Sequence, residues 1–116
     1  MPGYLTTHVL DTARGRPAAG MRITLDALEG GNRRRIAETV TNDDGRTDAP
    51  ILPQGEFAPG VYELTFHVGA WLDADGAHEG PRFLDEVPIR FGMSEAAHYH
   101  VPLLVSPFAF STYRGS

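Results

Sequence analysis

A repeat of two residues governs most of this chain and strongly limits the folds that it can adopt. In residues 61–68, Tyr62, Leu64 and Phe66 fall on one face, and Glu63 and Thr65 on the other. Successive side chains of a strand point to opposite faces, so this period predicts β-strands with one buried face. Further runs that we expect to form strands are residues 4–11, 21–28, 34–41, 86–91, 98–105 and 108–113.

Turn-forming residues separate these runs at short intervals. Segments such as EGGN at 29–32 and NDDG at 42–45 favour tight reversals of the chain. Only residues 69–77 have the composition for a helical turn or two, which we expect to end at Gly76. The sequence therefore predicts one all-β domain over residues 1–116, an antiparallel β-sandwich of seven or eight strands with one short helix.

Composition excludes several classes of function. The net charge of −5 gives no support for nucleic-acid binding, and the arginine run 33–35 is better explained as the solvated edge of a strand. The absence of cysteine excludes disulfides, thiolate metal sites and a cysteine nucleophile. No basic and apolar signal segment opens the chain, and no apolar run approaches the roughly 20 residues that span a bilayer. We therefore expect a cytoplasmic protein without membrane partners.

Two histidines share a strand face with apolar residues. Alternation in residues 98–105 places His98, His100 and Leu104 on the outer face of the sheet. Such a mixture of imidazole and apolar groups is more typical of an interface or a pocket floor than of plain surface. His8 lies in the first strand; taken alone, it would be interpreted as structural, as His67 and His78 are.

Arg46 follows the Asx-rich turn TNDDG, and a rigid turn could present its guanidinium group to a planar, oxygen-rich ligand. The alternative is a surface ion pair with Asp43, Asp44 or Asp48. Metal binding has weak support: His98 and His100 would need a third zinc ligand, and DADG at 73–76 is only a fragment of a calcium loop. We expect neither a metal nor a cofactor.

Four segments give the chain a family resemblance: HVLDTARGRPAAGMRI at 8–23, TNDDGRTDAPIL at 41–52, PGVYELTF at 59–66 and HYHVPLLVSPFAFSTYRGS at 98–116. Together they resemble the transthyretin-like family, specifically its 5-hydroxyisourate hydrolase branch. The terminal YRGS is the most specific motif. The hormone carrier of the same family has a lysine in place of His8 and lacks YRGS. Ala109 departs from the glycine or other small residue expected there.

The resemblance implies two four-stranded sheets with one short helix, and a homotetramer whose active sites lie where dimers meet. The reaction would be the ring-opening hydrolysis of the small molecule 5-hydroxyisourate. The implied functional residues are His8, Arg46, His100, Tyr113, Arg114, Gly115 and Ser116, with His98, Ser111 and Thr112 around them.

The implied chemistry suits these residue types. Imidazole can take a proton from water near neutral pH, and either His8 or His100 could be the base. His8 and Arg46 would also bind the substrate, together with Tyr113, Arg114 and Gly115, and Ser116 would orient a histidine. For Arg114, an ion pair is the alternative to substrate contact.

For the whole chain, the alternative function is a non-catalytic transthyretin-like binding module. We also expect Phe108 and Phe110 to anchor the last strand in the core, so that the terminal motif is held in place.

Overall fold

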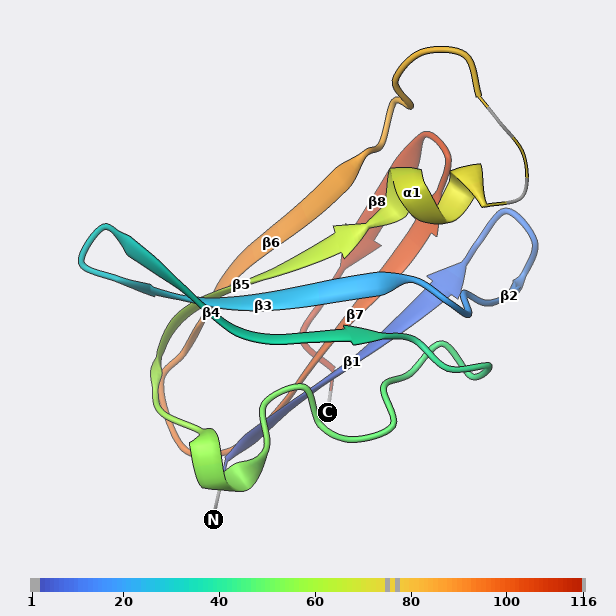
Figure 1. Ribbon diagram of the computed structural model, residues 1–116. Helices are drawn as coiled ribbons and strands as arrows, with labels where there is room; N and C mark the ends of the chain where they lie inside the picture. Colours follow the sequence, from blue (N-terminus) through green and yellow to red (C-terminus); the bar gives the residue numbers. More distant parts are fainter. Residues whose placement is uncertain (1–2, 75, 77, 116) are drawn as a thin grey trace.

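The computed structural model describes residues 3–74, 76 and 78–115. Two four-stranded sheets pack face to face, and the short helix α1 (Val68–Asp73) follows β5 at one end of the sandwich (Figure 1). Sheet A has the strand order β2-β1-β7-β8, with β1 (Tyr4–Asp11), β2 (Arg16–Pro17), β7 (His98–Ser106) and β8 (Ala109–Thr112). Sheet B has the order β4-β3-β5-β6, with β3 (Arg22–Glu29), β4 (Asn32–Val40), β5 (Gly60–His67) and β6 (Glu86–Met93). A 3₁₀ turn, η1, covers Gln54–Glu56.

The predicted sandwich is therefore confirmed, and seven of its strands lie in the predicted runs. The two-residue strand β2 was not predicted, because its residues sit within a segment rich in turn-forming residues. Helix α1 ends at Asp73 and not at Gly76.

Alternation produces the core as expected. The inward side chains of the central strands are fully or almost fully buried: Ile23, Leu25, Leu64, Phe66, Tyr99, Val101, Leu103 and Val105. Burial of apolar area at about 25 cal/mol per Å² is the main force that holds the two sheets together.

One strand pair differs from the antiparallel expectation. Strands β1 and β7 run parallel, with Tyr4 paired with His98 and Thr6 paired with His100. A parallel pair requires a long crossover, and here the whole of sheet B lies in the connection between the two strands. This register brings the histidines of β7 level with the start of β1.

The arginine run lies on the edge strand β4, as predicted, but it does more than cover that edge. Arg33 Nη1 lies 2.8 Å from Asp26 Oδ2 and 2.8 Å from Glu63 Oε1, and Arg35 Nε lies 2.6 Å from Asp26 Oδ1. Asp26 is only 2% exposed, so these arginines cover a buried carboxylate on the outer face of sheet B. The cluster also includes Arg90, which contacts Glu63.

The expectation that Phe108 and Phe110 anchor the last strand in the core is wrong. Their side chains are 75% and 45% exposed. Strand β8 is the short edge strand of sheet A and all its residues are exposed, and Phe108 contacts Phe83 at a ring-centroid distance of 6.0 Å. The segment after β8 is instead held by hydrogen bonds to β7, as described below.

Candidate active site

Four segments lie side by side on the outer face of sheet A and bring the predicted residues together. The turn that carries Arg46 forms a β-bridge with His8 of β1, and β1 pairs with β7. On the other side of β7, the segment after β8 forms a bridge between Gly115 and His100. These residues come from four parts of the chain and lie in two neighbouring rows of backbone pairing: Arg46 with His8 and Pro102, and Gly115 with His100 and Thr6.

His100 is held from both edges of its ring. Its Nδ1 lies 2.8 Å from Thr6 Oγ1. The Gly115 N–H donates to the His100 carbonyl at 2.7 Å, and a Cβ on Gly115 would lie 2.7 Å from His100 Cδ2. Since Nδ1 and Cδ2 flank Cγ, the ring is fixed at its base and its Nε2 lies at the far end. Among the described residues, none hydrogen-bonds this Nε2.

His8 is oriented by the turn before Arg46. Its Nε2 lies 3.0 Å from the Asp44 carbonyl, which can only accept, so Nε2 carries the proton and Nδ1 has the lone pair. Asn42 Oδ1 accepts from the backbone N–H groups of Asp44 and Arg46, which confirms the Asx turn. Gly45 has a φ of +75°, and the Val9 N–H donates to its carbonyl at 2.8 Å. The turn therefore docks firmly on β1.

The surroundings of His8 and His100 favour the neutral form of both imidazoles. Partial burial, and then the charge of Arg46, lower the pKa of His8, although the Asp44 carbonyl opposes this. Burial also lowers the pKa of His100, with further contributions from Arg46, His98 and His8. A neutral imidazole near pH 7 can accept a proton, which is the state that a general base requires. No ion pair between Arg46 and Asp43, Asp44 or Asp48 is found in the described part of the chain.

The remaining predicted residues have varied surroundings. The Tyr113 side chain is 60% exposed, and the Arg114 guanidinium carbon lies 4.1 Å from the ring centroid of Tyr99. That stacking within the chain replaces the ion pair considered for Arg114. Thr112 Oγ1 donates to the Pro102 carbonyl at 2.7 Å, and Ser111 pairs with Leu104. Ser116 lies outside the described residues.

Sequence reasoning did not assign a role to Thr6. Its Oγ1 also lies 2.7 Å from His98 Nε2, so one hydroxyl contacts both histidines of β7. His98 stacks on Tyr4, with ring centroids 4.1 Å apart.

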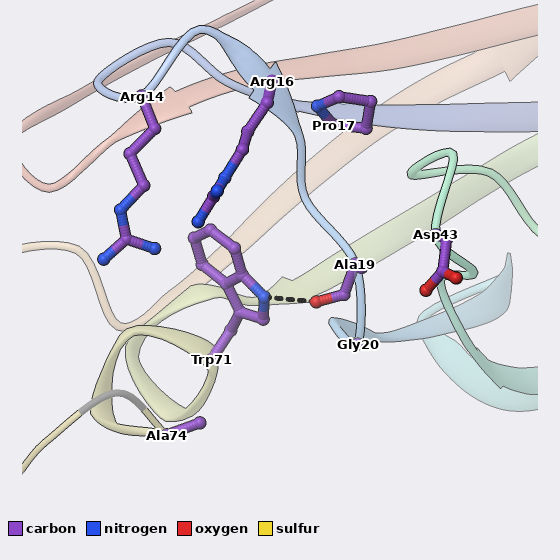
Figure 2. Close-up of a pocket in the computed structure, with 8 residues that line it drawn as sticks. All are labelled: Arg14, Arg16, Pro17, Ala19, Gly20, Asp43, Trp71 and Ala74. Atoms are coloured by element: carbon purple, nitrogen blue, oxygen red, sulfur yellow. Dashed lines mark hydrogen bonds between the residues drawn. The ribbon is translucent and has the colours of Figure 1, made fainter.

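His8, Arg46 and His100 lie on the open outer face of sheet A and not inside a deep pocket of the single chain. A hollow of about 160 Å³ is lined partly by Thr6 and Arg46. A larger one, of about 460 Å³, lies elsewhere, between the β1–β2 turn and α1 (Figure 2). There the Trp71 indole donates to the Ala19 carbonyl and Arg14 and Arg16 lie nearby, but none of the predicted site residues contributes.

The described ranges 3–74, 76 and 78–115 contain no group of three or more His, Asp or Glu side chains that could hold a metal ion. Asp73, from the candidate calcium fragment, pairs with Arg82 at 2.7 Å. Asp75 lies outside the described residues. Within the same ranges, no helix is long and apolar enough to cross a membrane.

Comparison with known proteins identifies the family of the chain. The model of the HIUase/Transthyretin family matches residues 5–115. The 5-hydroxyisourate hydrolase of Mesorhizobium japonicum is 57% identical over 115 residues, covering 98% of this chain and 93% of the relative.

Two solved structures show the same fold. The 5-hydroxyisourate hydrolase of Klebsiella pneumoniae is 36% identical with a TM-score of 0.80, covering 98% of this chain and 99% of that one. Sea bream transthyretin, solved with thyroxine, is 25% identical with a TM-score of 0.86, covering 99% and 95%. On the family match and the full-length similarity, this chain belongs to the HIUase/Transthyretin family.

Proposed function

We propose that this protein is an enzyme that hydrolyses 5-hydroxyisourate, in the breakdown of urate. The observation that carries the proposal is the gathering of His8, Arg46, His100 and Gly115 on one sheet face, in two neighbouring rows of backbone pairing. The sequence similarity to 5-hydroxyisourate hydrolases, at 57% identity to one of them, supports the same substrate. A non-catalytic binding module is not favoured, because such a module has no need for two neutral imidazoles beside an arginine.

In the proposed mechanism, water attacks a ring carbonyl of the substrate. His100 Nε2 takes a proton from the water as the new C–O bond forms, because no described residue hydrogen-bonds this nitrogen. The ring C–N bond then breaks and that proton passes to the departing nitrogen, which leaves an open ring and a carboxylic acid that loses its own proton to solvent. His8 would orient the water through Nδ1, since its Nε2 proton is engaged by the Asp44 carbonyl.

Arg46 would bind the substrate's carbonyl oxygens and stabilise the negative charge that develops during attack. Tyr113 and Arg114 would contact the substrate ring from the terminal segment, and Gly115 would allow the backbone to come close to His100. Ser116 stays in the proposal as a residue that orients a histidine. No step requires a metal or a cofactor.

We further propose a homotetramer, a dimer of dimers, in which a second dimer covers the open face and encloses the site. Half-buried Leu104, which shares the outer face of sheet A with the histidines, supports an interface there. Sedimentation should give the mass of four chains, and a monomer with full activity would contradict this part. A cytoplasmic location is also proposed, and fractionation of cells that express the untagged protein tests it.

The decisive experiment adds the protein to freshly oxidised urate and follows the ultraviolet absorbance of the intermediate. We expect the decay to accelerate, and His8→Ala, Arg46→Ala and His100→Ala to lower kcat/KM by about 10²–10⁴-fold. The control variant His78→Ala should have the wild-type rate, because His78 hydrogen-bonds the Gly80 carbonyl, on a loop that carries none of the predicted site residues. An unchanged decay with the wild-type protein would refute the proposed function.

A further inference from the structure

Thr6 occupies a central position between the two histidines of β7. The parallel register places Thr6 directly opposite His100 and Tyr4 opposite His98. From there, Thr6 Oγ1 reaches His98 Nε2 at 2.7 Å and His100 Nδ1 at 2.8 Å. Both distances are those of well-formed hydrogen bonds. The two imidazoles are thus joined through one oxygen atom.

The chemistry of a hydroxyl group restricts how these bonds can be shared. A threonine hydroxyl has one proton to donate and two lone pairs that accept. It cannot donate to both rings, so at least one of the two nitrogens must carry a proton at any time. When the Thr6 hydroxyl donates to His98, the His100 Nδ1–H must donate to Thr6, which leaves His100 Nε2 with its lone pair. The protonation of one ring therefore depends on that of the other.

We propose that Thr6 is a positioning residue that orients His100 and couples its protonation to that of His98, so that the two rings share one proton during hydrolysis. The inference rests on the proposed function, because it assigns a path to the proton that the attacking water loses.

The proton transfer conserves every atom and charge. As the water O–H bond breaks, an N–H bond forms at His100 Nε2. The Nδ1–H bond of His100 then breaks and a new O–H bond forms on Thr6, while the original Thr6 proton moves to His98 Nε2. His98 becomes the cation and His100 is neutral again. The reverse transfer returns a proton to His100 Nδ1, and the departing ring nitrogen then takes the proton that His100 Nε2 received from water.

The surroundings favour this displacement of charge. The charged and titratable groups that face His100 are Arg46, His8 and His98, and the positive charge of Arg46 opposes a proton on His100. His98 stacks on Tyr4 at 4.1 Å with an angle of 6° between the rings. An aromatic face attracts a cation, so Tyr4 would stabilise the protonated form of His98.

Thr6→Val tests the proposal, because valine keeps the shape of the side chain and removes the hydroxyl. We expect kcat to fall by about 10–100-fold with KM almost unchanged, since the loss concerns proton transfer and not substrate binding. Thr6→Ser restores a hydroxyl and should recover kcat to within about threefold of wild type.

Nuclear magnetic resonance of protein labelled with ¹⁵N-histidine provides a readout that does not depend on activity. In the wild type, the ring nitrogens of His98 and His100 should titrate as a coupled pair, and in Thr6→Val they should titrate independently. Thr7→Val is the matched control: the buried Thr7 hydroxyl donates to the Val101 carbonyl, so its loss should lower the thermal midpoint but leave the histidine coupling intact.

The outcomes separate this inference from the proposed function. A wild-type protein that does not accelerate decay of the intermediate refutes the function, while the coupled titration still tests the link through Thr6. Independent titration of the two histidines in the wild type overturns the inference. A Thr6→Val protein with wild-type kcat, or a Thr6→Ser protein as impaired as Thr6→Val, also overturns it.

Discussion

Replacing Gly115 with alanine should disable the site without unfolding the protein. The new Cβ would lie 2.7 Å from His100 Cδ2 and 3.3 Å from both Cβ and Cγ of the same residue. An ordinary contact begins at about 3.4 Å, so the imidazole must move by at least about 0.7 Å. On its opposite edge the ring is held by Thr6, so this shift would press Nδ1 against Thr6 Oγ1, which already lies at 2.8 Å, and displace Nε2.

A displacement of about 1 Å in a catalytic group can cost 10²-fold in rate, so we expect kcat/KM to fall by about 10–100-fold. Stability should change little. The backbone N–H of residue 115 still donates to His100, Gly115 does not have a positive φ, and its segment lies outside the core. Thermal unfolding followed by circular dichroism and the decay of the oxidised urate intermediate measure the two effects separately.

Gly92→Ala is the matched control. Gly92 is also in extended backbone at a sheet edge, but a Cβ there would meet no atom within 4 Å. That variant should retain the wild-type rate. If Gly115→Ala were also fully active, His100 would not need the ring position seen here, and the argument from close approach would be refuted.

Three further outcomes are expected. The acid limb of kcat/KM should have its inflection below the ordinary histidine value of about 6.5, because burial and Arg46 lower the pKa of His8 and His100; an inflection above pH 7 would contradict this. Asp26→Asn should destabilise the fold by about 1–2 kcal/mol in chemical denaturation, whereas Glu29→Gln, in an exposed pair, should change it by less than about 0.5 kcal/mol. Burial raises the pKa of Asp26, but the hydrogen bonds from Arg33 and Arg35 lower this pKa overall. The wild type should therefore lose the free energy of unfolding that the ionised Asp26 contributes as the pH falls below about 4. A free energy of unfolding that did not change there would refute the role of the cluster. Dialysis against a chelator should leave the rate unchanged, and activity that vanished and returned with zinc would favour a metal site.

The strands could be predicted because each leaves a clear signal in the sequence. An apolar residue at every second position needs a buried face, and a sheet provides one. The order of the strands has no such local signal, so the parallel pairing of β1 with β7 could not be read from the pattern. Hydrophobicity alone gives the wrong prediction at Phe108 and Phe110, because an apolar residue beside or in an edge strand can remain exposed.

Prediction of the site depended on different kinds of signal. His8, Arg46 and His100 stood out as polar residues at positions where a family resemblance gave them a role. Thr6 did not, because a threonine on the polar face of a strand is an ordinary strand residue. Its importance comes from the parallel register of β1 and β7. This register brings Thr6 within hydrogen-bond distance of His98 and His100, which follow it by 92 and 94 positions in the sequence.

The single chain aligns the reactive groups but does not enclose them. Backbone pairing fixes His8 beside Arg46, and His100 beside Gly115, in two neighbouring rows, so little conformational entropy remains to be lost when a substrate binds. Electrostatic stabilisation by Arg46, however, is strong only where water is excluded, and the face of sheet A is open. A second dimer over this face would strengthen the interaction of Arg46 with developing negative charge. It would also bury His8 and His100 further, and this burial would add to the lowering of their pKa that partial burial already causes. Assembly and catalysis would thus depend on the same surface, and this explains why the site residues lie on the outer face of a sheet instead of in a cavity of the fold.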